Sequence, residues 1–388
     1  MRKPTKRGSG KKPGLQIKHG QPSWTFCSDR VELAITQQGG HIAPVIFDRR
    51  GRRIQPFHIS PFSREKTLAK VPPVVRVLRG DFLCLPFGGN AKPFRGERHL
   101  PHGETANGRW RFVSHESSNG RHALTLQMPL RVRRGLVTKR VFLRDGEDVV
   151  YQEHVISGMS GPNCPGHHPN LEFRSQGRIA ISPFLWGSTY PHLIERPDQQ
   201  SYCGLKTGVT FRKLGKVPLI YGGESDLSIY PSRRGFMDVI QIVADPKLDV
   251  AWNTVAFPEE GWLYFALCDP KVLRQTVMWF SNGGRYSPPW NGRHVNVLGL
   301  EDVTCYVSEG LLASALPNPW TRRGAVTALN FSPKRPTSIR YIMGVARIPR
   351  GFQFVRDVRF EKDGIVLIGN RGRASARVDW RFVKRECR

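Results

Sequence analysis

Short runs of β-branched and aromatic residues, separated by Gly, Pro, Asn and Asp, recur from about Trp24 to the end of the chain. Several runs alternate apolar and polar residues, a period of two that is typical of a strand with one buried face. The pattern predicts strands over Val31–Thr36, Ile42–Phe47, Val74–Arg79, Trp110–His115, Ala123–Met128, Val149–Ser157, Asp238–Ala244, Val250–Phe257, Trp262–Cys268, Val295–Val307, Tyr341–Ile348, Phe352–Phe360, Gly364–Gly369 and Ala376–Val383.

Helical periodicity is scarce, and only Asp269–Gln275 indicates a helical turn. Strands separated by turns, without intervening helices, predict an all-β sandwich rather than βαβ units. No long linker divides residues 21–388, so we expect one large domain, with residues 318–388 as a C-terminal extension made of further strands. Residues 1–20 are rich in Lys, Arg, Gly and Pro and predict a flexible basic tail.

The chain of 388 residues has 60 Lys and Arg against 31 Asp and Glu, a formal charge of +29. A strong positive charge is typical of proteins that bind nucleic acid or acidic polysaccharide. The tail holds only seven of the basic residues. The basic runs Arg49–Arg53, Arg131–Arg140 and Arg371–Arg388 lack interleaved aromatic residues except near Trp380 and Phe382, and no zinc-finger, RNP or KH signature appears. Nucleic acid is therefore a disfavoured partner.

The seven cysteines are scattered and include no C-x-x-C pair. This spacing disfavours both a disulfide framework and a structural zinc site, and it favours reduced thiols. No apolar run approaches the roughly 20 residues that a membrane-spanning helix needs, and the N-terminus has no apolar signal segment. We expect a soluble cytoplasmic protein without a membrane partner.

Three polar clusters lie beside Gly- and Pro-rich turns, where functional sites are frequent. They are Arg79–Gly88 with the following Leu100–Gly103 and Trp110, then Gly166–Leu171, and finally Leu298–Glu301. Together they supply imidazoles, a carboxylate and a guanidinium, a set suited to proton transfer on a neutral, oxygen-rich substrate. Opening a cyclic sugar needs a base at the anomeric hydroxyl and an acid at the ring oxygen. Trp110 or Trp186 would stack on the sugar's apolar face.

These clusters resemble motifs of the aldose 1-epimerase and glucose-6-phosphate 1-epimerase families. Arg79–Gly88 is similar to the RGG-I-P-x-x-x-P-x-F-G segment, and residues 102–110 match HGFAR-N-x-x-W at His102, Gly103, Asn107 and Trp110. His168-Pro-Asn-Leu is similar to H-P-Y-F, and Gly299-Leu-Glu301 to the late G-x-E. The chain departs from the motifs at Glu104, Ala106 and Asn170.

The resemblance covers roughly Trp24 to Leu312 and implies a galactose-mutarotase-like β-supersandwich that interconverts α and β anomers of a hexose or hexose phosphate, with no cofactor and no metal. Carried over, His168 protonates the ring oxygen, Glu301 takes the anomeric proton, and His102 joins them in catalysis. Arg79, His167, Asn107 and Trp110 bind the sugar. Because adjacent strand residues face opposite sides, only one of His167 and His168 points into a cleft, and His168 is preferred.

Two alternatives remain open. The departures at Ala106 and Asn170 leave room for a non-catalytic sugar-binding protein on the same fold. The charge leaves room for a basic β-protein that binds nucleic acid or acidic polysaccharide. Single residues also have plain structural interpretations: Glu301 in an apolar strand can be an ion-paired carboxylate, and Arg79 a surface arginine. A metal site built on His99 and His102 lacks a third ligand at a recognised spacing.

Overall fold

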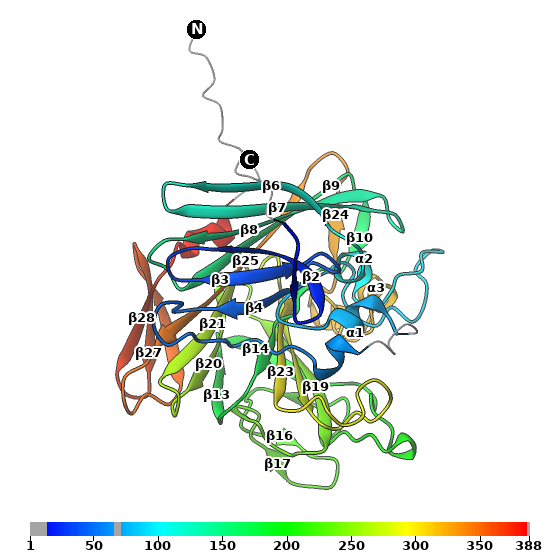
Figure 1. The fold of residues 1–388 in the computed structure, drawn as a ribbon. Coiled ribbons are helices and arrows are strands. Elements are labelled where there is room, and N and C mark those ends of the chain that lie inside the picture. Colours follow the sequence, from blue (N-terminus) through cyan, green and yellow to red (C-terminus); the bar gives the residue numbers. More distant parts are fainter. Residues whose placement is uncertain (1–13, 66–70, 386–388) are drawn as a thin grey trace.

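The structure is a computed structural model that describes residues 14–65 and 71–385, and antiparallel β-sheets dominate it (Figure 1). The largest sheet has nine strands, in the order β18 (Ile229–Tyr230), β13 (Gly177–Ile181), β20 (Ala251–Phe257), β21 (Trp262–Cys268), β25 (Thr337–Arg347), β9 (Val149–Ser157), β8 (Gly135–Arg144), β7 (Arg121–Leu130) and β6 (Arg111–Ser118). All its neighbouring strands pair antiparallel.

A second sheet of eight strands packs against it. Its order is β15 (Thr210–Phe211), β14 (Phe184–Thr189), β19 (Phe236–Ala244), β22 (Gln275–Asn282), β23 (Val297–Val303), β11 (Gly166–His167) and β5 (Leu83–Cys84), with β12 (Asn170–Glu172) also paired to β23. Apolar side chains of both sheets, such as Tyr264, Met343, Met278 and Leu300, form one buried core. This core confirms the prediction of an all-β sandwich.

Smaller sheets and short helices complete the chain. The sheets are β1 (Gln16–Lys18), β2 (Gln21–Cys27), β3 (Glu32–Thr36) and β4 (Ile42–Ile46); β26 (Val355–Phe360), β27 (Gly364–Gly369) and β28 (Arg373–Arg377); β10 (Gly161–Asn163) with β24 (Leu329–Phe331); and β16 (Val217–Pro218) with β17 (Glu224–Ser225). The α-helices are α1 (Pro73–Val77), α2 (Gly103–Asn107) and α3 (Leu311–Ala315), and the 3₁₀ turns are η1 (Pro61–Arg64), η3 (Pro197–Gln199), η4 (Thr321–Arg323) and η5 (Trp380–Lys384).

The C-terminal strands lie on the outer face of the nine-stranded sheet, at its edge in Figure 1. We call β26–β28 together with η5 the C-terminal layer. Its side chains Val358, Leu367 and Phe382 are buried in a second apolar core, together with Leu263 and Phe265 of β21. The nine-stranded sheet is thus buried on both faces over this region. This packing accounts for the strand pattern in the sequence from about residue 352, which lies beyond the family motifs.

Some sequence predictions are wrong. Residues 74–77 belong to helix α1: Val74 and Val77 are both buried, a spacing that fits a helix face, and Pro73 occupies the first helical position. Strand β28 ends at Arg377, and Trp380–Lys384 form η5 instead of continuing the strand. Of the predicted tail, residues 1–13 lie outside the described residues, but Gln16–Lys18 pair with β2 as a strand.

Several strands lie outside the predicted runs, and β8 and β22 are the longest of them. β8 falls partly within the basic run Arg131–Arg140, yet its Lys139 is fully buried and donates to the Gly40 carbonyl. β22 is buried along its whole length. In the parts of the chain that the structure describes, no helix has both the length and the apolar character of a transmembrane span.

Candidate functional site

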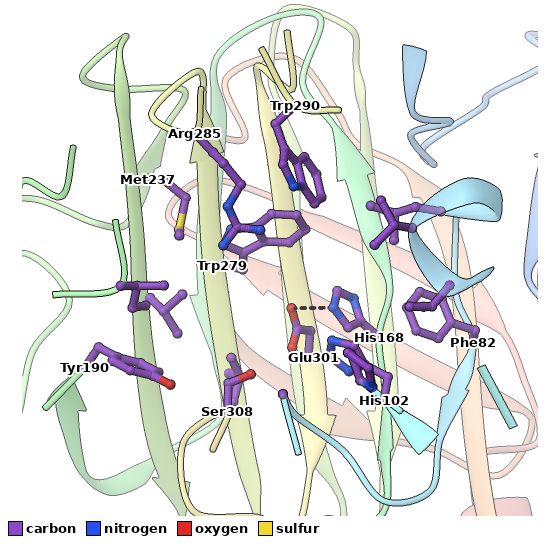
Figure 2. A pocket seen from close by; sticks show the side chains of 18 residues that line it. Phe82, His102, His168, Tyr190, Met237, Trp279, Arg285, Trp290, Glu301 and Ser308 are labelled. Carbon is purple, nitrogen blue, oxygen red and sulfur yellow. Dashed lines mark ion pairs between the residues drawn. The ribbon is translucent and has the colours of Figure 1, made fainter. Parts of the chain in front are cut away.

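A cavity of about 380 Å³ lies on the face of the eight-stranded sheet that points away from the nine-stranded sheet. Its walls come from β19, β22 and β23, from α1, and from the loops around residues 82–102 and 285–308 (Figure 2). Three of the predicted catalytic side chains, His102, His168 and Glu301, line this cavity together. A pocket of this size that collects several titratable groups is the default candidate for a binding site.

Glu301 reaches the cavity because of the alternation along β23. Its neighbours Leu298 and Leu300 point into the core between the two large sheets, so Glu301 points to the opposite face. Gly299 makes room for it: a Cβ atom at this position would lie 2.2 Å from Glu301 Oε1. The carboxylate lies 3.3 Å from His168 Nε2, the contact drawn as a dashed line in Figure 2.

His168 follows β11 and is held at its backbone and at its ring. Its amide donates a 3.0 Å hydrogen bond to Asp81 Oδ1. Its ring stacks on Phe82, with centroids 4.7 Å apart, and meets the edge of Trp279. Nδ1 is buried and has no hydrogen-bond partner among the described residues. The imidazole is therefore fixed by aromatic packing, and its two nitrogens are not consumed by the scaffold.

His102 stands beside His168, with ring centroids 5.0 Å apart. It precedes α2 in a left-handed backbone conformation (φ 60°), and its amide donates to the Gly88 carbonyl at 2.8 Å. Gly103 follows it, also at positive φ, and a Cβ there would lie 2.0 Å from the Leu85 carbonyl oxygen. The His-Gly pair thus allows the chain to turn tightly against β5 and to place the imidazole in the cavity wall.

Burial controls the protonation of these three groups. It raises the pKa of Glu301 well above its ordinary value, and the neighbouring Asp302 adds to this. It lowers the pKa of His168 well below its ordinary value, helped by the charge of His102, and lowers the pKa of His102 to about 4. Desolvation disfavours any charged form. Near neutral pH we therefore assign one shared proton to the Glu301–His168 pair and a neutral ring to His102.

The Asp81 carboxylate helps to position His168. Besides the His168 amide, its carboxylate contacts His167 Nδ1 at 2.9 Å and accepts a hydrogen bond from Gln152. The charge of His167 and these contacts lower the pKa of Asp81 despite its burial. His167 itself stacks on Tyr341 of β25 in the core between the sheets. Of the two adjacent histidines, therefore, only His168 lies in the cavity wall.

The four residues predicted to bind the sugar lie outside the cavity wall. Arg79 is fully buried, and its guanidinium donates to the carbonyls of Val77, Lys18 and His19, so it ties β1 to the body. The His167 ring contacts the Asp81 carboxylate, as described above. Both side chains therefore bond to the scaffold, and neither lines the cavity, so the geometry gives no support to a role for Arg79 or His167 in sugar binding.

Asn107 and Trp110 also bind the scaffold. Asn107 donates to the carbonyls of Pro101 and Gly103 and accepts from the Val74 amide, which fixes α1 against α2. The Trp110 indole donates to the Thr105 carbonyl at 3.0 Å. Trp186, considered as a stacking platform, packs on Trp320 far from these groups in the sequence and outside the cavity wall.

Sequence reasoning missed the aromatic part of the site. Trp279 of β22 and the following Trp290 line the cavity, and their rings meet edge to face, with centroids 5.7 Å apart. Arg285 lies over Trp290, with its guanidinium carbon 4.8 Å from the ring centroid, and forms an ion pair with Glu195. The signal for Trp279 was the apolar run Thr276–Phe280, which marks a strand that the turn pattern did not reveal.

The two histidines considered as metal ligands, His99 and His102, have different surroundings. His99 contacts Glu97 at 3.0 Å, whereas His102 faces the cavity. Across residues 14–65 and 71–385, no three His, Cys, Asp or Glu side chains are grouped to hold a metal ion.

The comparisons with known proteins identify the fold. By sequence, no protein-family model and no curated protein matches the chain. By structure, it is similar to a candidate aldose 1-epimerase from Escherichia coli K12 (15% identity, TM-score 0.57, covering 85% of this chain and 100% of that one). It is also similar to a candidate mutarotase from Salmonella typhimurium (11%, 0.55, 87% and 97%) and to a galactose mutarotase-like protein from Clostridium acetobutylicum (11%, 0.55, 86% and 98%). The predicted galactose-mutarotase-like β-supersandwich is therefore confirmed as the fold.

Proposed function

We propose that this chain, which has the galactose-mutarotase-like fold, binds a reducing sugar in the cavity and interconverts its α and β anomers. The observation that carries the proposal is the 3.3 Å contact between Glu301 and His168 in the cavity wall, with His102 beside it. The structural neighbours named as aldose 1-epimerases and mutarotases support the same reaction class. No cofactor or metal enters the proposed chemistry.

The reaction needs a base and an acid at the same time. The base takes the proton of the anomeric hydroxyl, and the electrons of that O–H bond form the C1=O1 double bond. The bond between C1 and the ring oxygen breaks, and the ring oxygen takes a proton from the acid. Rotation about C1–C2 and reclosure then give the other anomer. General acid–base catalysis by two positioned groups contributes about 10² to 10⁴ in rate for each group.

Glu301 and His168 supply both groups from their shared proton. Transfer of this proton from the carboxyl to the imidazole gives a carboxylate base and an imidazolium acid without exchange with water. The sugar's oxygens then replace the direct contact between the two side chains. His102, neutral because burial lowers its pKa to about 4, orients a hydroxyl by hydrogen bonding. In this assignment Glu301 is the base and His168 the acid.

Polarimetry and NMR exchange spectroscopy with several hexoses and hexose phosphates test the proposal. We expect Glu301→Gln and His168→Ala each to lower the rate of mutarotation by about a hundredfold or more. Exposed Glu224→Gln and His192→Ala are the matched controls and should keep the full rate. Unchanged rates in the cavity variants would show that the mechanism is wrong. Sugar binding without any rate enhancement in the unmodified protein would favour the non-catalytic sugar-binding alternative.

A further inference from the structure

The wall of the cavity is mostly apolar. The polar side chains in it are His102, His168, Glu301, Arg285, Ser308 and Tyr190, and the two tryptophans add indole N–H groups. The Tyr190 hydroxyl already donates to Glu309. The rest of the wall consists of Val74, Val75, Leu78, Phe82, Ile194, Met237, Val239 and Val277, with Pro101 and Gly89.

The titratable groups His102, His168 and Glu301 are gathered on one side, whereas Arg285 lies at the other end, beside Met237 and Trp290. Figure 2 shows His102, His168 and Glu301 close together, with Ser308 on the same side of the cavity. Met237 and Trp290 lie away from this corner, across Trp279. β19 and β22 contribute Met237, Val239, Val277 and Trp279 as a continuous apolar surface, and α1 supplies the two valines that complete it.

An unsubstituted hexose fits this division poorly. It carries hydroxyl groups around the whole ring, and those that face aliphatic side chains lose their hydrogen bonds to water without replacement. A ligand with one polar end and one apolar end meets both parts of the wall. The reducing end with its ring oxygen belongs at the acid–base corner, so the apolar part is attached to the sugar away from C1.

Arg285 does not turn the far end into a phosphate site. Its guanidinium is ion-paired with the buried carboxylate of Glu195 and lies over the Trp290 ring. A phosphate there would have to compete with Glu195 for the guanidinium, and it would bring two negative charges next to the Glu195 carboxylate. The charge pattern therefore favours a neutral substituent over an anionic one.

We infer that the cavity takes a reducing sugar that carries a neutral, apolar substituent remote from C1, rather than a free hexose or a hexose phosphate. The inference rests on the proposed function, because the placement of C1 at Glu301 and His168 comes from it. The segregation of the wall into a titratable corner and an apolar surface is the independent observation.

Calorimetry with a graded ligand series tests the inference on the full chain. The series is the free hexose, its 4,6-O-ethylidene acetal, its 4,6-O-benzylidene acetal and its 6-phosphate, each in the gluco and galacto configurations. All of them keep a free anomeric hydroxyl. We expect the benzylidene acetal of at least one configuration to bind about tenfold or more tightly than the free sugar, with the ethylidene acetal between them. Tighter binding of the free sugar or of the 6-phosphate in both configurations would overturn the inference.

Substitutions at constant shape locate the effect. Val239→Thr combined with Val277→Thr introduces two hydroxyls into the apolar surface and should lower the preference for the benzylidene acetal by about threefold or more. Val113→Thr, at an exposed position of β6, is the control and should leave the preference unchanged. An unchanged preference in the double variant would place the substituent elsewhere and contradict the inference.

Mutarotation rates measured on the same samples separate the two proposals. A preference for the acetals without rate enhancement would contradict the proposed function and keep the inference about the ligand. Rate enhancement on free sugars with no preference for the acetals would do the reverse.

Discussion

The cavity face of the eight-stranded sheet and the outer face of the nine-stranded sheet are covered in different ways. Both are β-surfaces covered by other segments of the chain. The C-terminal layer covers the outer face with apolar side chains such as Leu367 and Phe382. The cavity face is covered incompletely, and it buries imidazoles and a carboxyl, including His168 Nδ1 and His294 Nε2 without hydrogen-bond partners among the described residues.

The difference shows which buried groups serve the scaffold. In the C-terminal layer, charged side chains lie on the outside and the inside is a packed apolar core. Near the cavity, burial holds the Glu301 carboxyl neutral against its preference in solution, which costs stability, and it opposes protonation of the imidazoles. Perturbed titratable groups gathered at one cavity are typical of functional sites. The contrast can be tested by perturbing each region separately.

Acid should produce the largest effect, and it should act at the cavity and in the core between the two large sheets rather than in the C-terminal layer. Burial lowers the pKa of His41 to about 3 and of His102 to about 4, and also lowers those of His154, His168 and His294. Below pH 6.5 the unfolded chain takes up protons that the folded chain refuses, so stability falls as the pH drops. We expect a loss on the order of 5 kcal/mol between pH 7 and pH 4.5 in chemical denaturation.

The carboxyl groups of Glu301 and Asp302 oppose this trend. Burial raises both pKa values, that of Asp302 to about 6, so their contributions decline as the pH rises through those values and are regained in acid. Five imidazoles outweigh two carboxyls. Because the last histidine of the chain is His294, hydrogen exchange at pH 5 should accelerate in β11 and β23 before it does in β27. Equal acceleration in all three strands would contradict the contrast.

The next largest effect is expected from the C-terminal layer. Leu367→Ala removes a fully buried side chain from the second apolar core and should lower the free energy of unfolding by about 2–5 kcal/mol. The mutarotation rate per folded molecule should stay unchanged, because the side chain lies across the nine-stranded sheet from the cavity. Val366→Ala, at the half-buried neighbouring position, is the control and should cost less. A large loss of rate at full folding would show that the two regions are coupled.

Gly299→Ala should affect activity more than stability. The added Cβ lies 2.2 Å from Glu301 Oε1 and 3.1 Å from Trp279 Cβ, so the carboxylate must move away from His168. We expect about a tenfold loss in kcat, since small misplacements of a reacting group are costly, and a stability change within about 1 kcal/mol. Gly215→Ala, where an added Cβ would meet only ordinary contacts at 3.7 Å or more, controls for loss of a glycine. Full activity in Gly299→Ala would separate Glu301 from the chemistry.

The smallest effect is expected at an exposed ion pair outside both regions. Arg196 and Asp198 form a pair whose side chains are 65% and 60% exposed. Arg196→Ala should change the free energy of unfolding by less than about 0.5 kcal/mol, and added salt should not alter the difference measurably. A larger change would show that this ion pair stabilises the fold despite its exposure.

Part of the strand pattern was predictable because period-two alternation survives wherever one face is buried, as in β7 and β27. The pattern missed β22, which is buried on both faces. It was wrong for α1, whose three valines favour a strand although Pro73 and tertiary packing make the segment helical. Family motifs located His102, His168 and Glu301. They also suggested Arg79 and Trp110 as ligands, because a motif records which positions matter without distinguishing contact with substrate from support of the scaffold.

The neighbouring carboxyls of β23 show how strongly this site depends on strand register. Asp302 accepts hydrogen bonds from Asn253, Thr276 and Tyr341 inside the sandwich, whereas Glu301 faces the cavity. A slip of β23 by one residue against β22 would exchange their sides. Insertion or deletion of a single residue in this strand is therefore expected to erase the site while preserving its composition. Transfer of the cavity to another β-sandwich would therefore require the same hydrogen-bond register between β22 and β23.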